Sequence, residues 1–351
     1  MPPFQILFHL KYPIGEDAMN SLSVSEPNPL PNSLLRKLFH AFTGEYFWFY
    51  ILLLPSILIL VGLVIIPMLF TLRMSLANTS VTVIGGHGSL SMPWSGINNY
   101  IHLFQSPDFW QSFRETLFFW LASILIEVTV GVAIAVLMNQ QFLGQRVFRI
   151  IVFIPWAIPT VVNSMMWGMI MDGNNYGALN DLLLRMHVIK NAIVWLNPSA
   201  LFPHFSWLSH VLSSLGMNTA ILSIIVGDEW HTLPIVVVLV LAGLQTIPVE
   251  YYEAARVEGA TGWRKFRSIT LPLLGPILSV VLILRTMQLL RAFTMIYTLE
   301  QFGLPVLSIQ AYQQAFSFGS FGLGAATSFI IGLVALFISY IYIKRLYKEE
   351  L

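Results

Sequence analysis

Long apolar segments alternate with short polar ones along most of this chain of 351 residues. A helix that crosses a membrane needs about 20 predominantly apolar residues, because each residue adds only roughly 1.5 Å to its length. Six segments reach that length, so the pattern predicts an all-α membrane protein with six transmembrane helices. The six segments are residues 47–71, 116–139, 148–171, 218–245, 273–298 and 321–343.

Proline residues lie inside several of these apolar segments. Proline removes one backbone hydrogen bond of a helix, but in a membrane neighbouring helices can satisfy the carbonyl that it leaves free. We therefore expect kinks rather than breaks at these positions. The prolines concerned are Pro55, Pro67, Pro155, Pro159 and Pro234.

Lysine and arginine are distributed unevenly among the polar segments. With a cytoplasmic N-terminus, twelve of them fall on the cytoplasmic side and four outside. Basic residues favour cytoplasmic loops, so we expect both termini and residues 246–272 in the cytoplasm and the insertion 172–217 outside. The cytoplasmic set is Lys11, Arg36, Lys37, Arg146, Arg149, Arg256, Arg264, Lys265, Arg267, Lys344, Arg345 and Lys348. The external set is Arg73, Arg114, Arg185 and Lys190.

The chain is expected to divide into three parts. Residues 1–46 form a cytosolic N-terminal segment, partly disordered, which contains the proline-rich stretch EPNPLPN. Residues 47–346 form the transmembrane domain, and residues 347–351 form a cytosolic C-terminal tail. No signal peptide is evident, and Met19 is an alternative to Met1 as the translation start.

One long stretch without Asp, Glu, Lys or Arg, between Asn191 and Gly227, raises the question of a seventh span near 193–215. Its prolines, histidines and serines make a poor lipid-facing helix. A seventh span would also place the basic C-terminus and the loop 246–272 on opposite sides of the membrane. We expect instead that Phe205–Leu215 is an external helix at the membrane surface, anchored by Trp207.

Composition agrees with a membrane protein. The chain is 56% hydrophobic and only 10% charged, with a mean hydropathy of +0.73, whereas a soluble domain carries about 25% charged residues. A net charge of +1 gives no reason to expect a nucleic-acid partner. The absence of cysteine excludes disulfides, thiolate metal sites and cysteine nucleophiles.

Patterns of enzymatic and metal-binding residues are absent from the sequence. It contains no G-x-x-x-x-G-K-[ST] phosphate loop, no H-E-x-x-H pair and no G-x-S-x-G elbow. We therefore expect neither an ATPase site nor other catalysis on this chain. His231 has no second histidine at ligand spacing, so we expect a hydrogen-bonded packing residue rather than a metal ligand.

The polar loop between the fourth and fifth apolar segments carries the most specific pattern. Residues 249–272 read VEYYEAARVEGATGWRKFRSITLP. In this stretch EAA is followed by three residues and a glycine, and then by nine residues and I-x-L-P. The pattern resembles the coupling loop of binding-protein-dependent ABC importer permeases. The matching residues are Glu253, Ala254, Ala255, Gly259, Ile269, Leu271 and Pro272.

Three further motifs extend this resemblance over residues 47–346, to the sugar-type permeases of type I ABC importers, the maltose-type family. They are GVAIAVLMN at 131–139 with the turn that follows it, IPWAIP at 154–159 and LAGLQTIP at 241–248. Their order and spacing together make the resemblance specific.

Two segments depart from the family pattern. LEQFGLPVLS at 299–308 replaces a turn that usually contains GGP, and the external segment 198–216 is longer than usual. Both lie where a solute-binding protein would dock, so they bear on the partner and the solute rather than on energy coupling.

The resemblance implies a multi-pass subunit of the bacterial inner membrane, in the type I ABC importer permease fold. It implies a second homologous permease subunit, usually a different chain, and leaves a homodimer open. Two separate ATP-binding cassette subunits would bind ATP and Mg, and an extracellular or periplasmic protein would deliver the solute. The solute would be a sugar or a related polyol or glycoside, of a kind that the sequence does not specify.

The loop's residues suit a coupling role physically. Pro248 can begin a helix and Gly259 can end one, so a short cytosolic helix is expected between them. Small side chains such as Ala254 and Ala255 would let a partner backbone approach, and Glu253 would offer it a carboxylate. By resemblance this coupling helix seats in an ATPase subunit, whose closure on ATP shifts the spans from inward-open to outward-open.

Ionisable residues inside apolar segments are costly, so each is a functional candidate. We expect Arg285, Gln288 and Arg291 on one side of the fifth segment, because they lie three residues apart. Two interpretations stay open: an internal ion-pair network, or a water-filled cavity that holds a hydroxyl-rich solute by hydrogen bonds and aromatic stacking. The remaining candidates are Glu127, Asp228, Glu229, Trp230, Phe293 and Tyr297.

Two other functions compete with the importer. An ion-coupled secondary transporter would use Glu127, Asp228 and Glu229 as proton or cation sites. An intramembrane enzyme, such as a lipid-linked glycosyl transferase, would need catalytic acids clustered at one membrane face, whereas the acids here are scattered over several segments.

Overall fold

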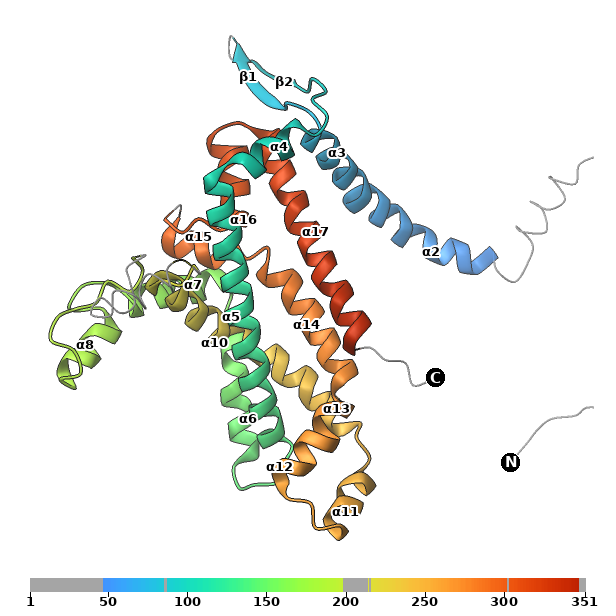
Figure 1. Ribbon diagram of the computed structural model, residues 1–351, viewed down its shortest axis with the longest axis vertical. Coiled ribbons are helices and arrows are strands. Elements are labelled where there is room, and N and C mark those ends of the chain that lie inside the picture. Colours follow the sequence, from blue (N-terminus) through green and yellow to red (C-terminus); the bar gives the residue numbers. More distant parts are fainter. Residues whose placement is uncertain (1–46, 85–86, 198–213, 215, 302, 347–351) are drawn as a thin grey trace, which may run out of the picture. The chain divides into compact units, whose positions relative to one another are not determined.

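The computed structural model describes residues 47–84, 87–197, 214, 216–301 and 303–346 (Figure 1). The predictions for residues 1–46 and 347–351, for Met19 as the start and for a surface helix anchored by Trp207 lie outside the described residues. The chain divides into two compact units, Met1–Ile66 and Pro67–Leu351.

The described part of the first unit is an apolar helix. α2 spans Phe47–Leu60 and continues as a π-helical turn at Val61–Ile65. Pro55 lies inside α2 without ending it, as the sequence predicts for proline in a membrane helix. The helix continues into α3, Ile66–Ser75, so that Phe49–Ser75 forms one candidate membrane span.

Four long helices form the frame of the second unit. α5 packs along α10, and α14 packs against α17, α5 and α10 (Figure 1). These helices span Pro107–Met138 (α5), Thr219–Gln245 (α10), Gly275–Leu289 (α14) and Phe321–Leu346 (α17). In the described part of the chain, five helices are long and apolar enough to cross a membrane, or six if one bent pair counts as a span. The prediction of a helical membrane protein is therefore confirmed.

Apolar side chains between α5 and α10 make up much of the core. One buried cluster includes Val132, Met138 and Val240 together with Leu278 of α14. Gly131 lets the two helices approach here, because a Cβ at this position would lie 2.7 Å from Cγ1 of Val236. The described structure thus holds α5 and α10 at a separation that a larger residue would change.

The third apolar segment is bent far more than a kinked helix. α6 spans Gln145–Phe153, a 3₁₀ turn covers Ile154–Ala157, and α7 spans Thr160–Ile170. The two halves meet at 98°. The break comes at Pro159, because a proline disfavours helical geometry at the residue before it, and Ile158 is extended with φ −81° and ψ 130°. The prediction of kinks rather than breaks is therefore wrong at Pro155 and Pro159, where one helix ends at Phe153 and the next begins at Thr160.

The fifth apolar segment is also interrupted. The pattern predicts one helix over 273–298, but α14 ends at Leu289 and α15 begins at Thr294, ending at Glu300. The helix of the second apolar segment is longer than predicted, because α5 begins at Pro107, well before the predicted residue 116. Proline suits the first turn of a helix, where its missing N–H needs no partner.

A β-hairpin, which the apolar pattern does not predict, connects α3 to α4, a helix at Asn98–Gln105. Its strands are β1, Ser80–Ile84, and β2, His87–Ser91. They pair antiparallel in a register that runs from Ser80 opposite Ser91 to Ile84 opposite His87. An isolated bridge from Ser80 to Ser320 joins the hairpin to the start of α17.

Shorter helices fill the connections between the long ones. α8 lies in the external insertion of the predicted topology, and α11 to α13 lie in the loop that carries the EAA motif. The bounds are Ala178–Arg185 (α8), Val249–Val257 (α11), Gly262–Lys265 (α12), Leu271–Leu273 (α13) and Leu307–Tyr312 (α16). π-helical turns follow α12 at Phe266–Thr270 and α16 at Gln313–Ser317.

Candidate functional site

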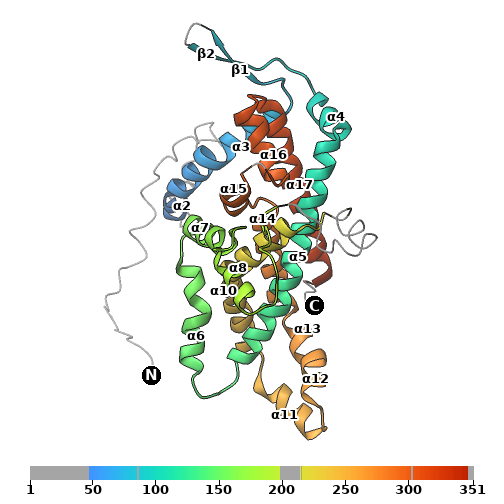
Figure 2. The ribbon, with the colours of Figure 1, turned by 90° about the vertical axis from the view of Figure 1, so that its left-hand side faces the viewer.

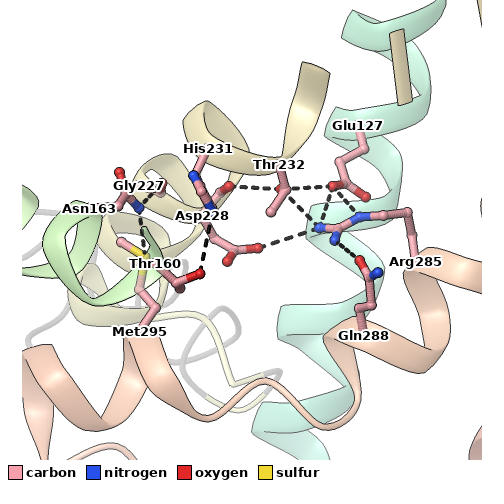
Figure 3. Close-up of polar contacts among 10 residues, drawn as sticks. All are labelled: Glu127, Thr160, Asn163, Gly227, Asp228, His231, Thr232, Arg285, Gln288 and Met295. Carbon is pink, nitrogen blue, oxygen red and sulfur yellow. Dashed lines mark hydrogen bonds and ion pairs between the residues drawn. The ribbon is translucent and has the colours of Figure 1, made fainter. Parts of the chain in front are cut away.

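Three long helices of the second unit are joined by one buried cluster of charges (Figure 3). Arg285 of α14 donates from Nε to Oε1 of Glu127 on α5 at 2.6 Å, and its Nη2 lies 2.5 Å from the same oxygen. Nη2 also lies 3.5 Å from Oδ2 of Asp228 on α10. The side chains of Glu127 and Arg285 are 0% and 4% exposed, and that of Asp228 is 15% exposed. A buried arginine is therefore held between two carboxylates.

Two neutral residues complete the hydrogen bonding of this cluster. Thr232 Oγ1 accepts from Arg285 Nη2 at 2.9 Å and lies 3.2 Å from Oε1 of Glu127. It also donates to the backbone carbonyl of Asp228 one turn earlier in α10. Gln288 Oε1 accepts from Arg285 Nη1. Because breaking such a network would leave a buried charge without a partner, it fixes how α5, α10 and α14 meet.

The same cluster forms part of the wall of a cavity of about 410 Å³. Asp228, Thr232, Arg285 and Gln288 line it on one side. Its volume lies in the range of small-molecule sites, roughly 300–1,000 Å³. The ion-pair network is thus itself part of a cavity wall, so the two interpretations of the intramembrane charges do not exclude each other. The other lining residues are Thr160, His231, Leu289, Arg291, Ala292, Phe293, Thr294 and Met295.

Arg291 lies at a different place from the one that helical spacing predicts. Arg285 and Gln288 contact each other on α14, but Arg291 follows the end of that helix at Leu289. It nevertheless lines the same cavity. Among the described residues it forms no ion pair and no hydrogen bond, so its guanidinium is available to a ligand.

Phe293 and Tyr297, two of the predicted aromatic residues of the solute path, pack against each other, and Tyr297 is not among the lining residues of the cavity. Their rings stack at 5.0 Å between centroids and 13° between planes. Phe293 lines the cavity directly. Glu229 and Trp230, in contrast, are not among its lining residues: Glu229 is buried in α10, and Trp230 packs edge-on against Trp167.

His231 holds two parts of the bent span against α10. Its Nε2 lies 3.4 Å from Oγ1 of Thr160 (Figure 3). Its Nδ1 lies 2.9 Å from the carbonyl oxygen of Pro155. Both ring nitrogens thus have protein partners, as expected of a packing residue. In the part of the chain that the structure describes, no group of three or more His, Cys, Asp or Glu stands ready to hold a metal ion.

The EAA segment forms a short helix with no buried residue. α11 begins directly after Pro248, and Gly259 has a φ of +75°, the left-handed geometry that ends helices. The space around Gly259 is open for 4 Å, and Glu253 and Ala254 are exposed. In Figures 1 and 2, α11 and the β1–β2 hairpin lie at opposite ends of the second unit.

The second limb of this loop fixes α11 to the long helices. Tyr252 of α11 shares a hydrogen bond of 3.0 Å with Thr270 in the π-helical turn. Trp263 stacks on Phe266 at 5.6 Å. Ile269, Leu271 and Pro272 follow in the same limb and lead directly into α14. This limb therefore connects α11 to α14, which carries Arg285.

Sequence reasoning missed Thr160 and Thr232 in the site. A single threonine hardly changes the hydropathy of an apolar segment, so the span pattern gives no signal for either. Thr232 has one indirect signal, since it lies four residues after Asp228 and thus on the same face of a helix.

The chain is similar to membrane components of binding-protein-dependent transport systems. Residues 127–348 match the family described as "Binding-protein-dependent transport system inner membrane component". Among similar proteins, the trehalose/maltose transport system permease protein MalF of Thermococcus litoralis is 33% identical over 299 residues, covering 84% of this chain and 92% of that protein. The sulfoquinovosyl glycerol transport system permease protein SmoG of Agrobacterium fabrum is 28% identical over 304 residues, covering 86% of this chain and 90% of that protein.

Among solved structures, a similar fold occurs in a bacterial ABC transporter involved in the import of the acidic polysaccharide alginate. The TM-score is 0.71 at 21% sequence identity, and the match covers 90% of this chain and 100% of that one. At this identity the likeness concerns the fold alone.

Proposed function

This chain belongs to the family of binding-protein-dependent transport system inner membrane components, and we propose that it is a permease subunit through which a sugar, or a related polyol or glycoside, enters the cell. The polar cavity beside Glu127, Asp228 and Arg285 carries this proposal. The names of MalF and SmoG, which refer to trehalose, maltose and sulfoquinovosyl glycerol, support the choice of solute class.

The cavity offers what a hydroxyl-rich solute needs. Arg291, Thr160 and Gln288 supply hydrogen-bond donors and acceptors at its wall. Phe293 supplies an aromatic face, on which the C–H face of a sugar ring can stack. Such a mixture of few polar groups with apolar and aromatic surface is typical of small-molecule sites. Arg285 contributes through its cluster, which keeps the wall in shape while α10 and α14 move.

Energy for uptake comes from partners. We propose that α11 is the coupling helix, with Glu253, Ala254, Ala255 and Gly259 facing a groove of a separate ATPase subunit, and that Ile269, Leu271 and Pro272 transmit its movement. The exposure of α11 and its attachment through Tyr252 support this role. The two ATPase subunits hold ATP and Mg, so that this chain carries no catalytic site of its own.

The proposed assembly also includes a second permease, usually a different chain, and a solute-binding protein outside the membrane. One solved structure of similar fold is an alginate transporter in complex with a periplasmic protein that carries an alginate pentasaccharide. The proposed topology places α11 and both termini in the cytoplasm and α8 outside. The uneven distribution of lysine and arginine supports this orientation.

The ion-coupled carrier remains the second candidate. It requires a carboxylate that is free to take up a proton or a cation. Glu127 and Asp228 share the positive charge of Arg285, which leaves Glu229 for that role. Neither oxygen of Glu229 has a hydrogen-bond partner in the part of the chain that the structure describes.

Reconstitution separates the two functions. The chain is placed in liposomes either alone with a proton or sodium gradient, or with its permease partner, ATPase subunits and binding protein and with ATP. We expect uptake of labelled glycosides only in the second case. Uptake by the chain alone, driven by the ion gradient, would overturn the importer and support the carrier.

A further inference from the structure

A row of five aromatic rings extends from the cavity along the neighbouring helices. Phe293 lies 5.0 Å from Tyr312, and Tyr312 lies 5.0 Å from Phe316, between ring centroids. Phe316 in turn lies 5.9 Å from Phe321 at the start of α17. Tyr297 stacks on Phe293 at the cavity end and lies 5.5 Å from Tyr312. We call these five residues the aromatic row.

All members of the aromatic row except Tyr297 line a second chamber, of about 530 Å³, between α16, α17 and α3. Arg291 and Phe293 line both this chamber and the first cavity, so the two spaces meet at a common wall. α16, which carries Tyr312, and the α17 end that begins at Phe321 lie near the end of the second unit that bears the β1–β2 hairpin, away from α11 (Figure 1). In the proposed topology this is the side from which the solute arrives.

The chemistry of the second chamber is mixed rather than purely apolar. Thr71, Ser308 and Ser328 contribute hydroxyl groups and Arg291 contributes a charge, next to Tyr312, Phe316 and Phe321. An apolar helix from a partner packed there would bury the guanidinium of Arg291 without a counter-charge, which is costly. A pyranose ring instead offers C–H groups to the aromatic rings and hydroxyls to Arg291.

The local backbone holds the row in place. The π-helical turn Gln313–Ser317 carries Phe316, and such turns occur frequently at functional sites. Gly324 lets α17 approach α16 and the π-helical turn closely. A Cβ at this position would lie 2.8 Å from the carbonyl oxygen of Ala311 and 2.9 Å from Cβ of Ala315. Ser308 donates a hydrogen bond to the carbonyl of Ala292 and so ties α16 to the segment that bears Arg291.

We propose that the second chamber is a further binding position for the solute, and that the path holds a glycoside of at least two pyranose rings at once. One ring occupies the first cavity at Phe293, and the next stacks on Tyr312 and Phe316 while Arg291 binds hydroxyls between them. This inference rests on the proposed function and adds to it the size class of the solute.

The test compares two phenylalanines that lie two residues apart. The side chains of Phe316 and Phe318 are each 68% exposed, but only Phe316 lines the chamber. Phe316→Leu, Phe318→Leu and Phe316→Trp are prepared in the full transport complex. Binding of labelled maltose and trehalose is measured beside that of glucose, together with ATP-dependent uptake of all three and the yield of assembled complex.

We expect Phe316→Leu to weaken binding of the disaccharides about threefold to tenfold, the value of one aromatic contact. Phe316→Trp should restore it, and Phe318→Leu should behave like the wild type. Glucose, which occupies the first cavity alone, should show no change in any variant.

Four results would overturn the inference. Equal effects of Phe316→Leu on glucose and on the disaccharides, or no effect on either, would show that no second ring binds there. A loss of the second permease from the purified complex, with normal sugar binding in what remains, would assign the chamber to the subunit interface. No ATP-dependent uptake of any glycoside in the wild-type complex would remove the proposed function itself, and the inference with it.

Discussion

Arg285 should contribute more to stability than any other charged residue of the second unit. Replacing it by methionine removes its hydrogen bonds to Glu127, Thr232 and Gln288 and leaves two carboxylates facing each other in the interior. Removing one partner of a buried ion pair costs about 3–5 kcal/mol. We expect Arg285→Met to lie at the upper end of that range, because both Glu127 and Asp228 lose their counter-charge.

The carboxylates should be less sensitive than the arginine, and in a definite order. Glu127→Gln removes the negative charge that lies 2.5 Å from Arg285, but Asp228 still balances the arginine. Asp228→Asn removes the charge of the more distant carboxylate, at 3.5 Å, so we expect a smaller loss than for Glu127→Gln. The predicted order of destabilisation is therefore Arg285→Met, then Glu127→Gln, then Asp228→Asn.

Unfolding of the detergent-solubilised chain by a denaturing detergent, followed by tryptophan fluorescence, gives the three free energies. Arg291→Met is the matched control, since it makes the same substitution at a residue with no ion pair among the described residues. It should change the free energy of unfolding by less than about 0.5 kcal/mol. If Arg285→Met were no more destabilising than Arg291→Met, the cluster would not hold the three helices together.

Three further outcomes are expected. Arg291→Gln should abolish solute uptake while the complex assembles and hydrolyses ATP, because the residue lines the cavity without a structural contact; a loss of assembly, measured by co-purification, would contradict this. Glu253→Lys combined with Gly259→Leu should release the ATPase subunits at least tenfold more readily, measured by pull-down, with the folded membrane domain unchanged; undiminished assembly and transport would refute the coupling role. Asn180→Ala should expose the segment around α8 to protease, since Asn180 bonds the Trp195 indole and three backbone carbonyls and its loss leaves several groups unsatisfied at about 1–3 kcal/mol each; an unchanged cleavage rate would contradict it.

Hydropathy predicts the spans well because transfer from water into lipid depends mainly on composition and length. It says nothing of direction, so the 98° bend at Pro155–Pro159 and the interruption after Leu289 do not appear in the pattern. The β-hairpin has a signal that the span pattern passes over: β-branched Val81 and Val83 come just before a glycine pair.

The sequence likewise predicts some residues of the candidate site and misses others. Charges in apolar segments identify Glu127, Asp228 and Arg285 from the amino-acid sequence alone, because each must find a partner. Which carboxylate meets the arginine depends on the rotation of three helices, and the sequence does not encode that rotation locally. Neutral partners such as Thr232 are harder still to identify from the sequence. A threonine hydroxyl can hydrogen-bond to the backbone of its own helix, so its presence in an apolar segment does not require a partner elsewhere.

The bonds of His231 have a mechanical consequence. The imidazole of this residue, which belongs to α10, contacts the bent span on both sides of its turn, at Pro155 and at Thr160. The bent span thus cannot straighten or fold further without displacing this ring, which also lines the first cavity. A change in the angle between α6 and α7 would therefore also reshape the cavity wall.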